Sequence, residues 1–172
     1  GSDENGMIKK EEIVSINIPS GVEDGMQLKV SGKGNAAPFD GIAGDLLVLI
    51  EVEEHELLKR EGKNIHYDCY INMAEAVLGS TIEIPTIKGK AKIKIETGTQ
   101  SGKILRLRGK GLPSINDYGN GDLLVHINVW TPQNITKEEK IFFEKSKNSE
   151  SFSPNPSQKD KSFFDKVKEM FN

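Results

Sequence analysis

The chain has 172 residues, of which 35% are hydrophobic and 28% charged, a composition typical of a soluble protein with one or two small domains. Its formal net charge of -3 argues against a nucleic-acid-binding protein, which usually carries a basic surface. No apolar run reaches the roughly 18 residues that a transmembrane helix needs. The single cysteine, Cys69, excludes an internal disulfide and is typical of the cytoplasm, where we expect the chain to act.

The first part of the chain predicts a polar lead followed by a small β domain. Residues 1–12 are polar. Beyond them, apolar residues alternate with polar ones, which is the period of a half-buried strand. The expected strands cover 14–18, 28–30 and 46–53. Residues 55–64 are charged, and we expect them to connect this domain to the next.

The second part predicts a larger β domain. The expected strands cover 65–73, 81–87, 91–95 and a last stretch that ends at Trp130. A short helix is expected over 74–78, closed by Gly79. Lys88-Gly89-Lys90 is predicted to form the turn of a hairpin.

The end of the chain predicts two helices joined by a linker. Thr136 and Glu139 have the spacing of a capping box, which predicts a helix over 136–147. Residues 148–159 are rich in serine, proline and asparagine and predict a flexible linker. A final amphipathic helix is expected over 162–171. Its apolar side carries Phe163, Phe164, Val167, Met170 and Phe171.

A single short helix is marginally stable in water, so we expect this last helix to dock on another surface. Two partners are open: its own domain, or a second copy of the chain. The linker gives the helix enough reach for the second, and we favour dimerisation.

Residues 18–52 and 95–129 are two copies of one pattern. They align without a gap at one constant offset, which predicts a duplicated domain. The matched positions are Gly21 with Gly98, Gly25 with Gly102, Gly32-Lys33-Gly34 with Gly109-Lys110-Gly111, and Gly44-Asp45 with Gly121-Asp122. The second copy follows strands and a short helix over 65–87 that have no counterpart before the first. The first domain is therefore either built differently or truncated. Gly1-Ser2 resembles the remnant of a cleaved tag, which favours truncation, and a sheet that loses strands has unpaired edges.

The two copies differ on one strand face. The first copy carries Leu47 and Leu49 where the second has Leu124 and His126. An additional exposed apolar face is what a peptide-binding groove needs. Burial of these leucines beneath missing segments explains the pattern equally well.

No motif predicts catalysis or a bound metal. The repeated Gly-Lys-Gly lacks the spacing and the strand-to-helix setting of a phosphate-binding loop. Asp45 and Asp122 begin strands at equivalent places and are expected to cap turns. The acidic run 53–56 around His55 is interpreted as a solvated linker, and Cys69 as a small core residue. We expect a protein that is not an enzyme.

Several stretches resemble the C-terminal half of the DnaJ co-chaperone family. They are IPSGVEDGMQLKVSGKGNA, GDLLVLIEVEEHELLKREG, MAEAVLGSTIEIPTIKGKAKIKI, GTQSGKILRLRGKGLPS and YGNGDLLVHINVWTP, with KSFFDKVKEMF similar to the tail of bacterial members. The resemblance implies two β-sandwich-like domains and a C-terminal helical region that dimerises. It also implies a role in holding non-native polypeptides and passing them to a DnaK-type ATPase.

The resemblance also implies where clients bind. The family's client groove lies in the first domain, and by motif only Leu58 belongs to it. With the divergent strand face, the candidate client-binding residues are Leu47, Leu49 and Leu58. The sequence contains no HPD-bearing J domain, no Gly/Phe-rich segment and no CxxCxGxG zinc modules. We therefore expect no zinc or other cofactor here, and no stimulation of a partner's ATPase.

The predicted fold is mainly β, with two tandem homologous β-sandwich-like domains and a C-terminal helical segment. The expected divisions are 1–12, 13–57, 58–132 and 133–172. The expected partners are unfolded polypeptides, a second copy of the chain and a DnaK-type chaperone, with no nucleic acid or membrane. A dimerisation scaffold that has lost its client groove is the alternative function.

Overall fold

The computed structural model describes residues 8–37, 41–116 and 118–157. The chain divides into two compact units, Gly1–Trp130 and Thr131–Asn172. The described strands all lie in the first unit, and α2 (Lys137–Ser146) forms most of the regular structure among the described residues of the second. The predicted fold class, mainly β with a C-terminal helical segment, is confirmed. No helix among the described residues is long and apolar enough to cross a membrane.

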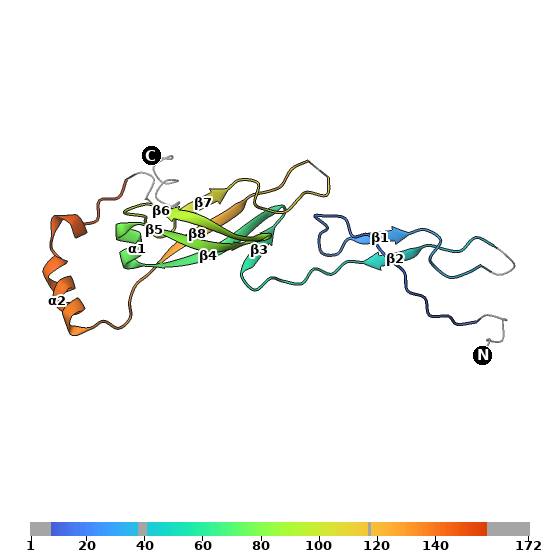
Figure 1. The fold of residues 1–172 in the computed structure, drawn as a ribbon, viewed down its shortest axis with the longest axis horizontal. Helices are drawn as coiled ribbons and strands as arrows, with labels where there is room; N and C mark the ends of the chain where they lie inside the picture. Colours follow the sequence, from blue (N-terminus) through green and yellow to red (C-terminus); the bar gives the residue numbers. More distant parts are fainter. Residues whose placement is uncertain (1–7, 38–40, 117, 158–172) are drawn as a thin grey trace, which may run out of the picture. The chain divides into compact units, whose positions relative to one another are not determined.

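A four-stranded sheet and a hairpin form the larger part of the first unit (Figure 1). The sheet has the order β3-β4-β8-β7, in which β4 and β8 are parallel and the outer pairs are antiparallel. Its strands are β3 (Leu58–Glu61), β4 (Asn64–Asn72), β7 (Ile104–Leu107) and β8 (Leu123–Trp130). The hairpin joins β5 (Ser80–Thr86) to β6 (Gly89–Ile95), and α1 (Met73–Leu78) connects β4 to β5.

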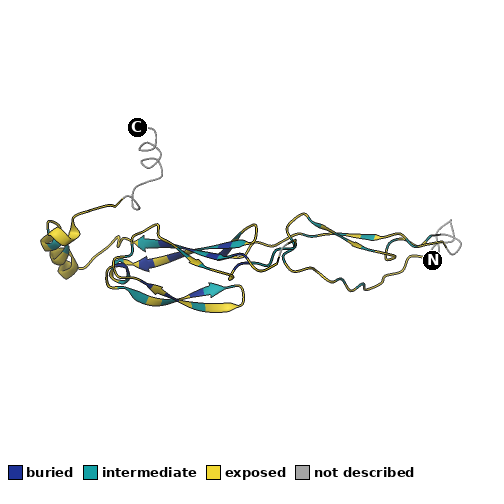
Figure 2. Cartoon of the chain, turned by 90° about the horizontal axis from the view of Figure 1, so that it is seen from above, coloured by how far each residue is buried: buried dark blue, intermediate teal, exposed yellow. Residues whose placement is uncertain are grey.

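Alternation along the strands builds one core between the sheet and the hairpin. Five side chains are less than 2% exposed, and they come from both layers: Ile84, Ile95, Leu123, Val125 and Ile127. Figure 2 shows the buried residues gathered in these strands. Fully burying an isoleucine or leucine side chain contributes roughly 1.5–3 kcal/mol. This core therefore supplies most of the hydrophobic stabilisation of the described residues, and it lies between two β layers.

The first repeat forms a two-stranded sheet of β1 (Gln27–Val30) and β2 (Leu46–Leu49). These strands match β7 and the start of β8 in the second repeat. The pairing register is also the same, since Gln27 pairs with Leu49 as Ile104 pairs with His126. The duplication seen in the sequence is thus a duplication of backbone geometry.

Asp45 and Asp122 cap equivalent turns, as predicted. One carboxylate oxygen of Asp45 accepts the Gly32 N–H at 3.2 Å, and Asp122 accepts the Gly109 N–H at 3.0 Å. Both glycines need a left-handed backbone, with φ of 72° and 73°, which glycine adopts without steric cost. The second oxygen of each aspartate pairs with a basic side chain of the neighbouring strand, at 3.0 Å in the first repeat and 3.1 Å in the second.

Four local predictions are wrong. The strand expected over 46–53 ends at Leu49, because its ladder with β1 ends there. Residues 14–18 form no strand, because a strand is held by ladder hydrogen bonds and none of the described strands pairs with this segment. The charged connection 55–64 instead contains β3, which turns into β4 through Gly62 and Lys63. The β5–β6 turn consists of Ile87 and Lys88 rather than residues 88–90, because Thr86 pairs with Gly89 and Pro85 with Lys90.

Arg60 on β3 holds the first turn of the first repeat. Its guanidinium donates to the Val22 carbonyl oxygen at 2.6 Å and to the Gly21 carbonyl oxygen at 3.0 Å. Its Nε donates to the Gly62 carbonyl oxygen at 2.8 Å. A planar fork with several fixed donors suits two adjacent carbonyl groups. This contact ties β3 to the first turn of the first repeat.

The second unit contains α2 (Lys137–Ser146) and the short 3-10 helix η1 (Glu150–Phe152). The capping box at Thr136 and Glu139 is present as predicted. η1 lies within residues 148–159, the segment that was expected to be a flexible linker. Phe142 contacts Phe143 and Phe152 edge to face, with ring centroids 5.5 and 6.4 Å away. The predicted dimerisation residues Phe163, Phe164, Val167, Met170 and Phe171 lie outside the described residues.

Candidate functional site

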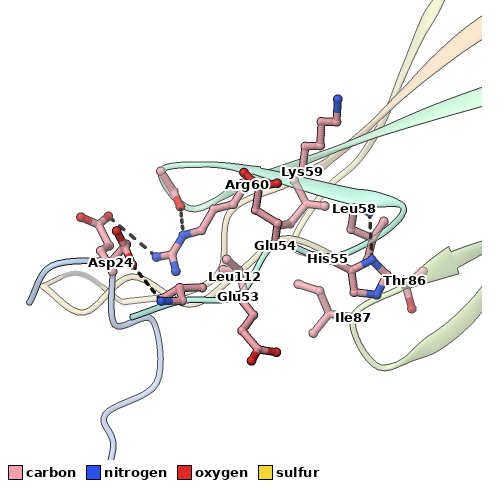
Figure 3. Close-up of a pocket in the computed structure, with 14 residues that line it drawn as sticks. Asp24, Glu53, Glu54, His55, Leu58, Lys59, Arg60, Thr86, Ile87 and Leu112 are labelled. Atoms are coloured by element: carbon pink, nitrogen blue, oxygen red, sulfur yellow. Dashed lines mark hydrogen bonds and ion pairs between the residues drawn. The ribbon is translucent and has the colours of Figure 1, made fainter. Parts of the chain in front are cut away.

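A cavity of about 1050 Å³ opens in the first unit beside β3 (Figure 3). It is lined by the turn at Glu23 and Asp24, the segment 52–55, β3 with its turn, Ile65 of β4, and residues 86–87 at the end of β5. Leu112 completes the lining. The cavity, named the β3 pocket below, joins the first repeat to the sandwich.

The floor of the β3 pocket is apolar. Leu58 and Ile65 are only 7% and 4% exposed, so they form its base as part of the sandwich core. Ile87 and Val52 keep 44% and 42% of their surface exposed and offer apolar area to a ligand. Leu58, which was predicted to contact clients, therefore lines the pocket mainly from beneath.

The rim of the pocket is acidic. Glu23, Asp24, Glu53 and Glu54 line it together with the basic residues Lys59 and Arg60. In Figure 3 the Lys59 side chain extends away from the other labelled side chains. Glu23 lies 3.8 Å from the Arg60 guanidinium, which itself is committed to carbonyl groups. The rim is thus dominated by carboxylates.

His55 shapes the entry into β3. Its Nδ1 accepts the backbone N–H groups of Leu57 and Leu58, both at 3.0 Å. An acceptor at Nδ1 leaves the proton on Nε2. The histidine that was interpreted as part of a solvated linker therefore fixes the backbone that presents Leu58. The only sequence signal was its position just before the pair Leu57-Leu58.

Leu47 and Leu49 lie outside the β3 pocket. They are 64% and 61% exposed on one face of β2. The structure therefore places the three predicted client-binding residues on two surfaces of the first unit. Leu58 joins the β3 pocket, while the two leucines of β2 form an exposed apolar pair beside the edge of their own sheet.

In the second repeat, the corresponding face of β8 carries a histidine that contacts β4. His126, the counterpart of Leu49, contacts His66 of β4 through ring nitrogens 2.7 Å apart. His66 in turn lies 3.5 Å from the Glu61 carboxylate. Leu124, the counterpart of Leu47, is half-buried. The apolar pair is therefore a property of the first repeat alone.

Two further properties of the described residues are their capacity for metal binding and the reactivity of Cys69. They contain no group of three or more His, Cys, Asp or Glu side chains that could hold a metal ion. Cys69 is 4% exposed in the core, and one cysteine does not fit the cysteine-rich zinc modules of the family. Burial, with a smaller effect of the Glu75 charge, raises the pKa of the Cys69 thiol, so the nucleophilic thiolate is disfavoured.

Comparison with known proteins agrees with this picture. The sequence profile of a family described as DnaJ C terminal domain matches residues 3–132. The chain is 49% identical over 168 residues to the chaperone protein DnaJ of Bacteroides thetaiotaomicron, covering 98% of the chain and 42% of that protein. It is 50% identical over 144 residues to the same-named protein of Porphyromonas gingivalis, covering 84% and 38%.

A more distant relative is similar over almost the same region. The chain is 41% identical over 168 residues to the chaperone protein DnaJ of Bacillus licheniformis, covering 95% of the chain and 43% of that protein. The chain thus spans about two fifths of the length of these relatives.

Proposed function

The chain belongs to the DnaJ C-terminal domain family, and on this premise we propose that it binds extended apolar segments of unfolded polypeptides. The family is one of non-enzymatic co-chaperones that act in protein folding. Binding would need main-chain hydrogen bonds and apolar contacts, and no reaction. Both are offered by the first repeat.

The open edge of β2 carries this proposal. In the second repeat, β8 is paired on both sides, with β7 antiparallel and β4 parallel. In the first repeat, β2 pairs with β1 on one side, and no described strand pairs with its other edge. Unpaired N–H and C=O groups along a strand edge accept a further strand by the same ladder hydrogen bonds.

The pairing of β4 with β8 shows what an added strand would gain. In the second repeat, the Ile65 N–H of β4 donates to the Asp122 carbonyl oxygen at 2.9 Å. Asp45 is the counterpart of Asp122 in the first repeat, so its carbonyl oxygen is in place for the N–H of an added strand. A segment on β2 would find Leu47 and Leu49 on the exposed face beside it. Main-chain bonds would supply affinity for any extended sequence, and the leucines would select apolar ones.

Two other readings compete with this proposal. The β2 edge and its leucines would be covered in a longer form of the protein, or the chain would be only a dimerisation scaffold. A peptide titration separates them from client binding. A fluorescein-labelled peptide with a leucine- and valine-rich core is titrated with the chain, and fluorescence anisotropy reports binding.

We expect saturable binding that Leu47→Ser/Leu49→Ser weakens about a hundredfold, since each buried leucine contributes about 1.5 kcal/mol and every 1.4 kcal/mol is a factor of about ten in affinity. Val77→Ser/Leu78→Ser is the matched control, because these exposed apolar residues lie on α1. No saturable binding, beside clear binding by a longer form of the protein, would leave the scaffold as the function.

Dimerisation and client transfer complete the proposal. The apolar residues in the sequence of 162–171 support association of two copies through the end of the chain. The second unit also exposes Ile141, Phe142 and Phe152, at 52%, 56% and 47%. Transfer of clients to a DnaK-type ATPase would belong to the longer protein. The bacterial relatives support the cytoplasm as the place of action.

A further inference from the structure

We propose that His66 of β4 and His126 of β8 form a pair that responds to acid. One N–H between the two rings joins neighbouring strands through their side chains. A proton on each ring would break this contact. The proposal is independent of the proposed client binding.

The two rings meet through their nitrogens. Nδ1 of His66 and Nε2 of His126 are 2.7 Å apart, while the ring centroids are 5.0 Å apart. The nitrogens are closer than the centroids, so the rings point at each other. So short a contact needs an N–H on one nitrogen and a lone pair on the other. The contact therefore depends on where the two rings carry their protons.

The far nitrogen of His66 decides the direction of this hydrogen bond. Its Nε2 is shielded from solvent and forms no hydrogen bond among the described residues. The Glu61 carboxylate of β3 lies 3.5 Å from this nitrogen. A lone pair on Nε2 would face a negative charge, whereas an N–H there faces an acceptor. We therefore assign a proton to Nε2 of His66, which leaves its Nδ1 to accept the N–H of His126.

Acid changes the pair in two steps. One added proton, on Nδ1 of His126, leaves the contact intact, because an N–H still faces a lone pair. A second proton must enter at Nδ1 of His66. An N–H would then face an N–H, and two positive rings would lie in contact, so the rings would separate. Histidine is the side chain whose charge ordinarily changes between about pH 5 and 8.

Charged side chains lie around the pair but do not replace its hydrogen bond. They come from β3, β4, β7 and the residue before β8, and are Lys59, Glu61, Asp68, Arg106 and Asp122. Arg106 and Asp122 pair with each other at 3.1 Å. Within the described part of the chain, only Glu61 forms an ion pair with either ring. The link between β4 and β8 on this face therefore depends on the protons of the two histidines.

The pair belongs to the second repeat and lies behind the β3 pocket. In the first repeat, Leu49 stands at the position of His126. His66 follows Ile65 on β4, and successive side chains of a strand point to opposite faces. Ile65 forms the floor of the pocket with Leu58. A change at the pair would therefore act on the strand that carries this floor.

NMR spectra of the chain labelled with 15N at histidine test the proposal on the wild type. The three histidines are His55, His66 and His126. At about pH 8, His66 should carry its proton on Nε2. On acidification to about pH 5, the signals of His66 and His126 should each report two steps, as those of coupled groups do, while His55 should report one. A single step at both rings, or a His66 proton on Nδ1 at the higher pH, would overturn the proposal.

His126→Gln is the variant whose contact should persist in acid. A glutamine amide donates an N–H as His126 does, can turn to accept one, and takes up no proton. In the wild type the folded state binds the second proton less readily than the unfolded state, so acid favours unfolding. Between about pH 7 and 5, its unfolding constant in urea should rise about threefold to tenfold more than that of His126→Gln, the equivalent of one hydrogen bond.

Asp68→Asn is the matched control, because it removes an exposed carboxylate that pairs with His126 in the ladder. It should keep the response of the wild type. Equal pH dependence in the wild type and His126→Gln would show that the pair does not respond as proposed. The NMR steps are measured on the wild-type chain and decide the question even where a variant fails to fold.

Discussion

Gly44 and Gly121 occupy the same position in the two repeats but have different surroundings. A Cβ atom added at Gly121 would collide with the carbonyl oxygen of Lys63, in the turn between β3 and β4. At Gly44 the nearest atom to an added Cβ is the Asn35 carbonyl oxygen, at 3.8 Å. Glycine at this position is therefore a requirement of the neighbouring hairpin, which only the second repeat has among the described residues.

We predict that Gly121→Ala lowers the free energy of unfolding by about 2 kcal/mol, the size typical of forced overpacking. Gly44→Ala is the matched control and should change it by less than about 0.5 kcal/mol, as an ordinary surface substitution does. Urea unfolding followed by circular dichroism measures both. A large loss in Gly44→Ala would mean that this edge of the first repeat is covered.

At the scale of elements, α2 is held at its start by side chains rather than by burial. No residue of the helix is buried, so its first turn depends on the capping box. The Thr136 side chain accepts the Glu139 N–H at 3.2 Å, and Glu139 accepts the Thr136 N–H at 2.8 Å. These hydrogen bonds, first to the Thr136 backbone and then to its side chain, lower the pKa of Glu139.

A lowered pKa predicts how α2 responds to acid. The stabilising effect of ionised Glu139 is present above the unfolded pKa of about 4.3 and is lost as the pH falls through the lower folded value. We predict that the helical Cα chemical shifts of α2 decline over this range in NMR spectra.

Thr136→Ala should reduce these shifts already at neutral pH, since loss of an N-cap costs about 1 kcal/mol. It should also flatten their dependence on acid. Thr131→Ala, outside the box, should behave as the wild type. Equal acid sensitivity in both variants would show that the box does not control α2.

At the scale of the whole molecule, the two compact units suggest a division of labour. The first unit contains the sandwich core, the open β2 edge and the β3 pocket. The second is almost entirely exposed in its described residues. We propose that the second unit serves mainly to join two copies of the chain through residues 162–171.

We predict that the chain of 172 residues sediments as a dimer and that a chain ending at Ser153 sediments as a monomer. Phe163→Ser/Phe164→Ser in the full chain should have the same effect, because it removes apolar surface without shortening the chain. Lys161→Ser is the control and should remain dimeric. An unchanged oligomer after truncation would exclude these residues from the interface.

Local sequence was sufficient wherever local interactions decide the structure. The alternation in β4, β5, β6 and β8 and the box at Thr136 were both predicted from short-range patterns. The gapless repeat also predicted that Asp45 and Asp122 would cap matching turns. These features need only neighbours in sequence, or a copy of themselves.

Tertiary structure decided what depends on a distant partner. Residues 14–18 have the pattern of a strand but none of the described strands pairs with them, whereas the charged β3 is a strand because β4 pairs with it. The β3 pocket arises because Arg60 holds the turn at Gly21 and Val22 near residues 58–65. Hydrogen-bond partners so far apart in sequence leave no local pattern. The sequence therefore determined the repeat and its turns, and only the tertiary structure separated Leu58 from Leu47 and Leu49.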